Sequence, residues 1–228
     1  TGQSSCMNAS EGHYSINSTW IEIISNNGFE STLEAGTSFS CAIATNGSIF
    51  CWGSNSNGQL GDGTGNQSLA PVAVVMPSGK TAIELSTGDT HACAIMDDRS
   101  LFCWGHNGYG QLGDGEQVDE QRKSLIPIEV DFPSGTAFRE VSAGGWHTCA
   151  IVDSGDAYCW GLGEFGQLGD GTTGDDTQEF SNSTPARVSF PPNTNVTGIS
   201  SGYHHTCAIL EGGMAYCWGN RNDGRLGF

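Results

Sequence analysis

The cysteines are the residues of this chain whose spacing most directly implies chemistry. Eight of the nine form four pairs with nine intervening residues: Cys41/Cys51, Cys93/Cys103, Cys149/Cys159 and Cys207/Cys217. Zinc sites use shorter C-x₂₋₄-C spacings that converge from several elements, so this spacing does not match a metal site. Cysteines that face each other across a β-hairpin lie about 5 Å apart at Cα, within disulfide range. We predict four disulfides, one per hairpin, over the alternatives of metal binding and buried free thiols, and we expect no metal and no cofactor.

Disulfides of this kind would place the protein in an oxidising compartment, extracellular or at the cell surface. Each bridge closes a small ring and contributes about 2–3 kcal/mol in the loop-entropy model. Cys6 remains unpaired within this segment. Its context in residues 1–16 resembles the cysteine-rich repeats of extracellular ephrin-receptor-like stalks. That resemblance implies a partner for Cys6 upstream.

Histidine recurs at one position of the sequence. His91, His147 and His205 each lie two residues before the first cysteine of a pair, where the first pair has Phe39. A catalytic histidine needs a nucleophile and an orienting acid nearby. A residue that recurs in this way is better explained by the same structural role at each occurrence. We predict that these rings hydrogen-bond backbone in a neighbouring turn, and we predict no enzyme.

Tryptophan and aspartate recur in the same manner. The tryptophans that follow the second cysteine of each pair are Trp52, Trp104, Trp160 and Trp218. We expect their rings to fill the wedge between adjacent sheets rather than to box an aromatic ligand. Asp62, Asp114 and Asp170 lie in Gly-Asp-Gly triplets. A calcium loop needs several oxygen ligands at close spacing, so we interpret these triplets as tight turns.

The cysteine pairs mark four copies of a longer repeat that begins Cys-Ala-Ile and ends Cys-Trp-Gly. Each copy predicts a β-hairpin with a three-residue loop, whose third residue adopts a left-handed conformation and is usually glycine. Gly47, Gly155 and Gly213 hold that position, and Arg99 holds it in the second copy. We expect the Arg99 turn to be the least relaxed. Both faces of each hairpin are apolar, which predicts a sheet buried between two like sheets.

Composition supports an all-β chain and excludes several classes. Charged residues make up 14% of the 228 residues, and 34 residues are glycine. That leaves too little of the Leu, Lys, Glu, Arg and Ala mixture that builds helical bundles. The net charge of −17 opposes binding to nucleic acid or anionic membranes, which require clustered Lys and Arg. No apolar run approaches the roughly 18 residues of a transmembrane helix, so we expect no membrane insertion within this segment.

A longer pattern frames each hairpin: Gly-x-x-His-(Thr/Ala)-x-Ala-Ile before it, then Trp-Gly-x-x-x-x-Gly-Gln-Leu-Gly-Asp-Gly. This pattern resembles the repeat of the regulator of chromosome condensation family over about residues 18–228. Those repeats form the blades of a β-propeller, often with seven blades. The resemblance implies an all-β propeller fold. The four repeats visible here form either a small closed ring or an arc of a larger propeller.

The repeats also divide the chain. We expect residues 1–16 to be the end of a stalk-like segment, as the resemblance implies. We expect the propeller repeats of residues 17–228 to comprise a half-repeat and four units: 17–35, 36–87, 88–143, 144–201 and 202–228. The half-repeat carries the kind of strand that the last repeat lacks. An unpaired edge strand exposes a row of backbone donors and acceptors. We therefore expect residues 20–25 to pair with the last repeat, within one chain in a closed ring or between chains in an assembly.

Two sets of residues mark possible surface sites. Asn-x-Ser/Thr sequons, the acceptors for N-glycosylation, occur at Asn8, Asn17, Asn46, Asn66, Asn182 and Asn195. Rigid scaffolds bind partners through variable loops, and the segments after Gly-Asp-Gly vary between repeats. Possible binding residues in these segments are the acidic ones, Glu116, Asp119, Glu120, Asp175, Asp176 and Glu179.

Two functions from different classes remain. The first is a non-catalytic extracellular module that binds a protein or glycan within a larger cell-surface or secreted protein. The resemblance favours it, because family members outside the nucleus include secreted propellers that bind and inhibit other proteins. The alternative is a structural subunit of an extracellular filament or sheath, assembled by strand donation between copies. A monomer in solution favours the first function, and filaments favour the second.

Overall fold

The computed structural model describes residues 12–16, 19–23, 29–172, 180–192 and 194–227. Strands dominate this part of the chain, and its one helical element is the 3₁₀ turn Asn222–Gly224. The prediction of an all-β chain is confirmed. In the described residues no helix is long and apolar enough to cross a membrane.

The strands form four antiparallel sheets after a two-stranded sheet of β1 (Gly12–Ile16) and β2 (Thr19–Ile23). The first sheet contains β3 (Phe29–Ala35), β4 (Phe39–Ala44), β5 (Ile49–Gly53) and β6 (Ser68–Ala73). The second contains β7 (Ala82–Thr87), β8 (His91–Met96), β9 (Leu101–His106) and β10 (Lys123–Glu129). The third contains β11 (Phe138–Ala143), β12 (His147–Val152), β13 (Ala157–Leu162) and β14 (Ser181–Arg187). The fourth contains β15 (Val196–Ser201), β16 (His205–Leu210) and β17 (Ala215–Gly219).

Each sheet is built around one predicted hairpin. In the third sheet Cys149 pairs with Cys159 and Ile151 pairs with Ala157. The turn between them ends at Gly155, whose φ of 85° lies in the left-handed region, and the amide of Gly155 donates to the carbonyl of Val152. The equivalent pairing and turn recur in the other three sheets. The three-residue loop that was predicted from the sequence is confirmed.

The register places each cysteine pair directly across its hairpin. Disulfide bonds join Cys41–Cys51, Cys93–Cys103, Cys149–Cys159 and Cys207–Cys217, as predicted. The bridges of the first three sheets have no exposed surface. The bridge of the fourth sheet is half-buried at both cysteines.

The central strands are buried on both faces because each sheet packs against the next. Every residue of β8 and of β12 is buried. Three apolar clusters fill the spaces between consecutive sheets, and Trp104, Trp160 and Trp218 each lie in or against one of them. Trp52 is half-buried. In contrast, Ile209 of β16 is 52% exposed, because no sheet covers the outer face of the fourth one in the described residues.

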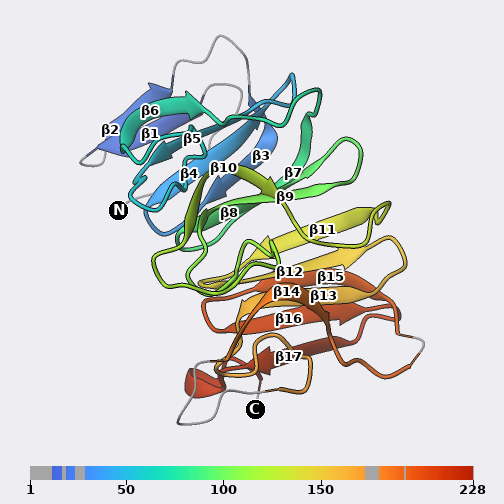
Figure 1. The fold of residues 1–228 in the computed structure, drawn as a ribbon. Coiled ribbons are helices and arrows are strands. Elements are labelled where there is room, and N and C mark those ends of the chain that lie inside the picture. Colours follow the sequence, from blue (N-terminus) through green and yellow to red (C-terminus); the bar gives the residue numbers. More distant parts are fainter. Residues whose placement is uncertain (1–11, 17–18, 24–28, 173–179, 193, 228) are drawn as a thin grey trace.

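The stack is an open arc. The first and fourth sheets lie at opposite ends of it, and the sheets between them follow in chain order (Figure 1). Strand β2 pairs with β1, and β17 pairs with β16 alone among the described strands. The expected pairing of residues 20–25 with the last repeat of the same chain is therefore wrong for the described residues 20–23. Of the two predicted arrangements, the arc is the observed one.

The turn at Arg99 gives a direct test of backbone strain. Arg99 has a φ of 68°, where a residue with a Cβ is disfavoured. We expect Arg99→Gly to raise the free energy of unfolding by about 0.5–1 kcal/mol, measured by urea denaturation. The control is Gly213→Ala, at a φ of 86° with no atom within 4 Å of the added Cβ, which should be destabilising through conformation alone. An unchanged midpoint for Arg99→Gly would contradict the argument.

The burial of the disulfides predicts their order of reduction. Reduction needs access of a thiolate to sulfur, and only the Cys207–Cys217 bridge is partly exposed in the described chain. Under a mild, non-denaturing reductant we expect alkylation at Cys207 and Cys217 before the other six disulfide cysteines. Mass spectrometry of the alkylated peptides measures this order. Simultaneous labelling of all four bridges would show that reduction follows global unfolding instead.

Candidate binding face

The alternation of antiparallel strands sorts the connections onto two faces. One face carries the loops between the first two strands of each sheet, at residues 36–38, 88–90, 144–146 and 202–204, together with the links that precede β6, β10 and β14. We call it the loop face. The opposite face, here called the turn face, carries the hairpin turns at residues 45–48, 97–100, 153–156 and 211–214. Sequence differences between repeats concentrate in the loop-face links.

A hydrogen-bonded joint holds neighbouring sheets together beneath the loop face. The carbonyl of Gln111, after the second sheet's hairpin, accepts from the Trp160 indole at 2.9 Å and from the Thr148 hydroxyl at 2.8 Å. His91 Nε2 lies 2.8 Å from the same hydroxyl oxygen. Because the hydroxyl hydrogen is used on Gln111, the His91 ring donates through Nε2. All four groups are buried.

The joint repeats between the third and fourth sheets. There Trp218 and Thr206 donate to the carbonyl of Gln167 at 2.9 and 3.0 Å, and His147 Nε2 lies 2.9 Å from the Thr206 hydroxyl. The sequence prediction of a backbone partner is wrong for His91 and His147. The partner is the threonine hydroxyl of the following repeat. This hydroxyl, and not the histidine, donates to the backbone carbonyl.

The first joint keeps the tryptophan contact and replaces the polar pair. Trp104 donates to the carbonyl of Gln59 at 3.0 Å. Phe39 occupies the histidine position and Ala92 the threonine position, and both belong to the same apolar cluster. The histidine and threonine are thus exchanged together for an apolar pair.

Burial controls the ionisation of the joint histidines. Complete burial lowers the pKa of His91 and of His147 to about 3, with a further lowering from nearby histidines. Their Nδ1 atoms are buried without a hydrogen-bond partner. Both rings are therefore neutral near pH 7, and their geometry suits a structural role rather than proton transfer.

Carboxylates of the first strands of the second and third sheets add contacts that the sequence patterns did not indicate. Glu84 Oε1 accepts from the amide of Val141 at 2.7 Å, and Glu140 Oε1 accepts from the amide of Ile199 at 2.9 Å. Burial raises the pKa of the Glu84 carboxyl. The same strand position in successive repeats is the signal that could have revealed them.

The Gly-Asp-Gly aspartates shape turns, as interpreted from the sequence. Asp62 accepts from the amide and hydroxyl of Thr64, both at 2.9 Å, and from the Asn55 amide group at 3.0 Å. Asn55 is fully buried, and its Oδ1 accepts from the amide of Leu60. In the described residues no three His, Cys, Asp or Glu side chains gather as a metal site would require.

Aromatic rings form a continuous row across the loop face. We call it the aromatic row, and its members are His106, Tyr109, Trp146, Phe165, Tyr203 and His204. Ring centroids are 6.0 Å apart for His106–Tyr109, 5.6 Å for Tyr109–Trp146, 5.1 Å for Trp146–Tyr203 and 4.9 Å for Phe165–His204. The row crosses the second, third and fourth sheets. None of its members belongs to the three apolar clusters between the sheets.

The row is accessible and lies beside acidic groups. Tyr203 is 47% exposed and Phe165 is 37% exposed. Burial of its ring and the charge of Asp89 raise the pKa of Tyr203, so that this carboxylate acts on the row. The charge of Glu164 acts on His204, whose pKa is nevertheless lowered, mainly by burial.

Comparison with known proteins identifies the fold. A sequence model of the RCC1-like domain matches residues 20–228. The chain belongs to this family. It is 31% identical over 193 residues to the ultraviolet-B receptor UVR8 of Arabidopsis thaliana, covering 85% of this chain and 42% of that protein. It is 32% identical to the human probable E3 ubiquitin-protein ligase HERC6, covering 86% of this chain and 19% of that protein.

Solved structures agree with this RCC1-like assignment. Prp20p of Saccharomyces cerevisiae superposes with a TM-score of 0.80 at 23% identity, over 93% of this chain and 50% of that one. The β-propeller fold class is thereby confirmed. The RCC1-like chain spans about half the length of this structure and 42% of UVR8.

Three of the six acidic residues expected to bind partners belong to the described residues, and all three are accessible. Glu116, Asp119 and Glu120 are exposed in the loop-face link before β10. Asp175, Asp176 and Glu179 lie outside the described residues. Glu120 contacts the aromatic row, because its backbone is hydrogen-bonded to His106, a member of the row. The sequence did not reveal the row itself, because its rings meet only across sheet boundaries. Tyr109 contacts Trp146, and the equivalent residue Phe165 contacts His204 in the next repeat.

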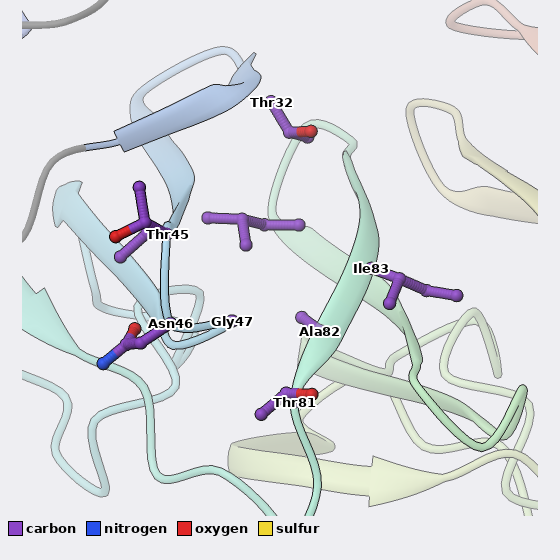
Figure 2. A pocket seen from close by; sticks show the side chains of 9 residues that line it. Thr32, Thr45, Asn46, Gly47, Thr81, Ala82 and Ile83 are labelled. Carbon is purple, nitrogen blue, oxygen red and sulfur yellow. The ribbon is translucent and has the colours of Figure 1, made fainter.

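The sequons are distributed over both faces. Asn8 and Asn17 lie outside the described residues, Asn66 and Asn195 are exposed, and Asn182 is half-buried. Asn46 is exposed on the first hairpin turn, beside a shallow hollow on the turn face. Figure 2 shows Thr45, Asn46 and Gly47 on one side of this hollow and Thr81, Ala82 and Ile83 on the other. Glycosylation of any of them stays a prediction.

The buried histidines predict acid lability with a defined pH window. Their folded pKa of about 3 lies below the unfolded value of 6.5. The contribution of these neutral histidines to the free energy of unfolding is therefore fully present above pH 6.5 and is lost as the pH falls towards 3. The loss is about 1.4 kcal/mol per pH unit for each histidine.

The matched variant is His147→Phe combined with Thr206→Ala, which copies the Phe39/Ala92 joint. Its unfolding free energy, followed by urea titration between pH 7 and 4, should fall less steeply than that of the wild type. Parallel pH profiles for the two proteins would contradict the assignment of His147.

Proposed function

We propose that this RCC1-like chain is a non-catalytic, extracellular or cell-surface module that binds a protein or glycan partner through its loop face. The observation that carries the proposal is the aromatic row, which is partly exposed on the loop face of the sheets beside variable acidic loops. Binding surfaces are enriched in aromatic side chains, and variable loops on a rigid scaffold are where recognition residues concentrate.

The buried cysteine pairs support the proposed compartment. Disulfides persist in oxidising environments and are rare in the cytosol and nucleus. The chain carries four of them, one in each of the four large sheets. The repetition of the bridge in every repeat indicates a role in stability, because a redox-active pair would need only one accessible site.

Protein binding also fits what is described for a relative. The structure of Prp20p is described together with its binding to Gsp1p and histones. That activity belongs to Prp20p, whose likeness to this chain establishes the fold alone. The proposal of a binding role rests on the loop face of this chain, and the catalytic role named for HERC6 is not transferred.

A second function is favoured by the edge of the fourth sheet. Among the described strands β17 has one neighbour, and Ile209, Met214 and Tyr216 around it are exposed. Such an edge is a template for strand addition. Assembly into an extracellular filament or sheath by strand donation between copies therefore remains the alternative. Light scattering after size exclusion separates the two, since a concentration-independent monomer excludes self-assembly.

The proposed binding role is tested with matched charge variants. The disulfide-bonded chain is screened against an array of purified extracellular proteins and glycans. For any saturable ligand, the loop-face variant Glu116→Gln/Asp119→Asn/Glu120→Gln should weaken binding several-fold. The turn-face variant Asp97→Asn/Asp153→Asn/Glu211→Gln has the same charge change and should leave binding unaltered. Absence of any ligand, or equal effects of the two variants, would refute the proposal.

A further inference from the structure

We propose that the aromatic row is a recognition site for a cationic segment of a protein partner, with an arginine side chain stacked on its rings. The inference rests on the proposed binding function and specifies its ligand. It would assign the central contacts to Trp146 and Tyr203, and the surrounding charge to Asp89 and Glu164.

The backbone holds the two central rings side by side without using their side chains. The amide of Asp89 donates to the carbonyl of Gly144 at 3.3 Å, and the amide of Gly145 donates to the carbonyl of Gly202 at 3.2 Å. These bonds tie the loops of the second, third and fourth sheets into one ladder. Trp146 and Tyr203 project from that ladder with ring centroids 5.1 Å apart, edge to face. Their spacing is therefore fixed before any ligand arrives.

The rings are not needed to fill the interior. Tyr203 leaves 47% of its surface in solvent, and Trp146 is only half-buried. A contiguous aromatic surface of this kind on a soluble protein marks an interaction site more often than a packing feature. His204 completes the surface, at 4.5 Å from Tyr203 and 5.5 Å from Trp146 between ring centroids.

The charge around the row favours a cation. Asp89 and Glu164 take part in none of the ion pairs found in the described part of the chain. Of the basic groups nearby, Arg225 pairs with Asp223, whereas Lys123 donates to the carbonyl of Ser56 and keeps its charge. Asp89 and Glu164 are thus carboxylates beside the row that a cationic ligand can neutralise, in a chain whose net charge is −17. Lowered pKa values keep His106 and His204 from supplying positive charge near pH 7.

An arginine side chain satisfies both features of this surface. Its guanidinium stacks on aromatic faces and also pairs with carboxylates in a planar fork. Lysine offers a point charge with weaker stacking, so the site should prefer arginine. A glycan would stack on the rings too, and its hydroxyls could donate to Asp89 and Glu164, but a neutral sugar cannot neutralise their charges. The acidic border therefore favours the peptide ligand.

The experiment uses defined peptides as probes. Fluorescent peptides made of four repeats of Gly-Ser-Arg, Gly-Ser-Lys or Gly-Ser-Glu are titrated into the full disulfide-bonded chain at several salt concentrations. The arginine peptide should bind saturably and at least several-fold more tightly than the lysine peptide, and the glutamate peptide should not bind. Trp146→Ala and Tyr203→Ala should each weaken the arginine complex about five-fold or more. Tyr203→Phe, which retains the ring, should bind like the wild type.

Two controls isolate the surface. Met214→Ala removes a side chain that is 58% exposed on the turn face, and it should leave binding unchanged. Asp89→Asn/Glu164→Gln should weaken arginine binding, whereas Asp97→Asn/Asp153→Asn, with the same change in net charge, should not. Thermal melts show which variants remain folded, and the exposed Tyr203 variants keep the test valid if Trp146→Ala destabilises the chain.

The outcomes separate this inference from the function on which it rests. Equal binding of the arginine and lysine peptides that is insensitive to Trp146→Ala and Tyr203→Ala would overturn the inference and indicate attraction by net charge alone. Absence of arginine-peptide binding would also overturn it. If array ligands still bind and depend on Glu116, Asp119 and Glu120, the binding function survives with a different ligand chemistry. A glycan ligand lost in Trp146→Ala would assign the row to sugar stacking instead.

Discussion

The interaction that organises this structure is a hydrogen bond to a buried backbone carbonyl, whose donors belong to the next sheet. The carbonyl of Gln111 is buried and points out of the second sheet, where leaving it unpaired would cost roughly 1–3 kcal/mol. Trp160 and Thr148 of the third sheet both donate to it. Apolar packing alone is non-directional and tolerates sliding, whereas these bonds are made at one register. The contact of tryptophan with the glutamine carbonyl recurs at all three boundaries, and threonine joins it at two of them. This geometry therefore fixes how each sheet is placed on the one before it.

The joint also explains why histidine recurs without doing chemistry. Once the threonine hydroxyl has donated to the carbonyl, its oxygen needs a donor, and the Nε2 hydrogen of His91 or His147 supplies one. Where the first joint has Ala92 in place of threonine, no hydroxyl needs a donor, and Phe39 fills the space instead. The Phe39/Ala92 pair needs no neutral histidine. The histidine–threonine pair makes a directional hydrogen bond between sheets, but its buried histidine makes the joint sensitive to acid.

Contacts that are local in sequence were predictable, and those between repeats were not. The Cys149–Cys159 bridge and the Gly155 turn follow from counting residues along a single hairpin, so the register could be derived. In contrast, Thr148, the hydrogen-bond partner of His91, lies 57 residues further along the chain. No pattern within one repeat predicts that contact. The expected pairing of residues 20–25 with the last repeat of the same chain is wrong for the described residues 20–23 for a related reason. Repeat position shows which strand could fill an edge, but not whether the arc bends far enough to bring the two together.

The aromatic row was missed because its contacts join neighbouring repeats and are not local in sequence, as Tyr109–Trp146 and Phe165–His204 show. The loop tips keep the same backbone bonds from sheet to sheet, as Gly145 to Gly202 and Asp89 to Gly144 show, while their side chains change. Since the scaffold needs only the backbone there, the exposed ring of Tyr203 and the half-buried ring of Trp146 need another reason to be present. In a repeat protein the positions that recur explain stability, so the departures from recurrence on a shared surface are where function should be sought. The loop tips of the third and fourth sheets are such departures, and the carboxylates beside them limit the chemistry of the partner they can accept.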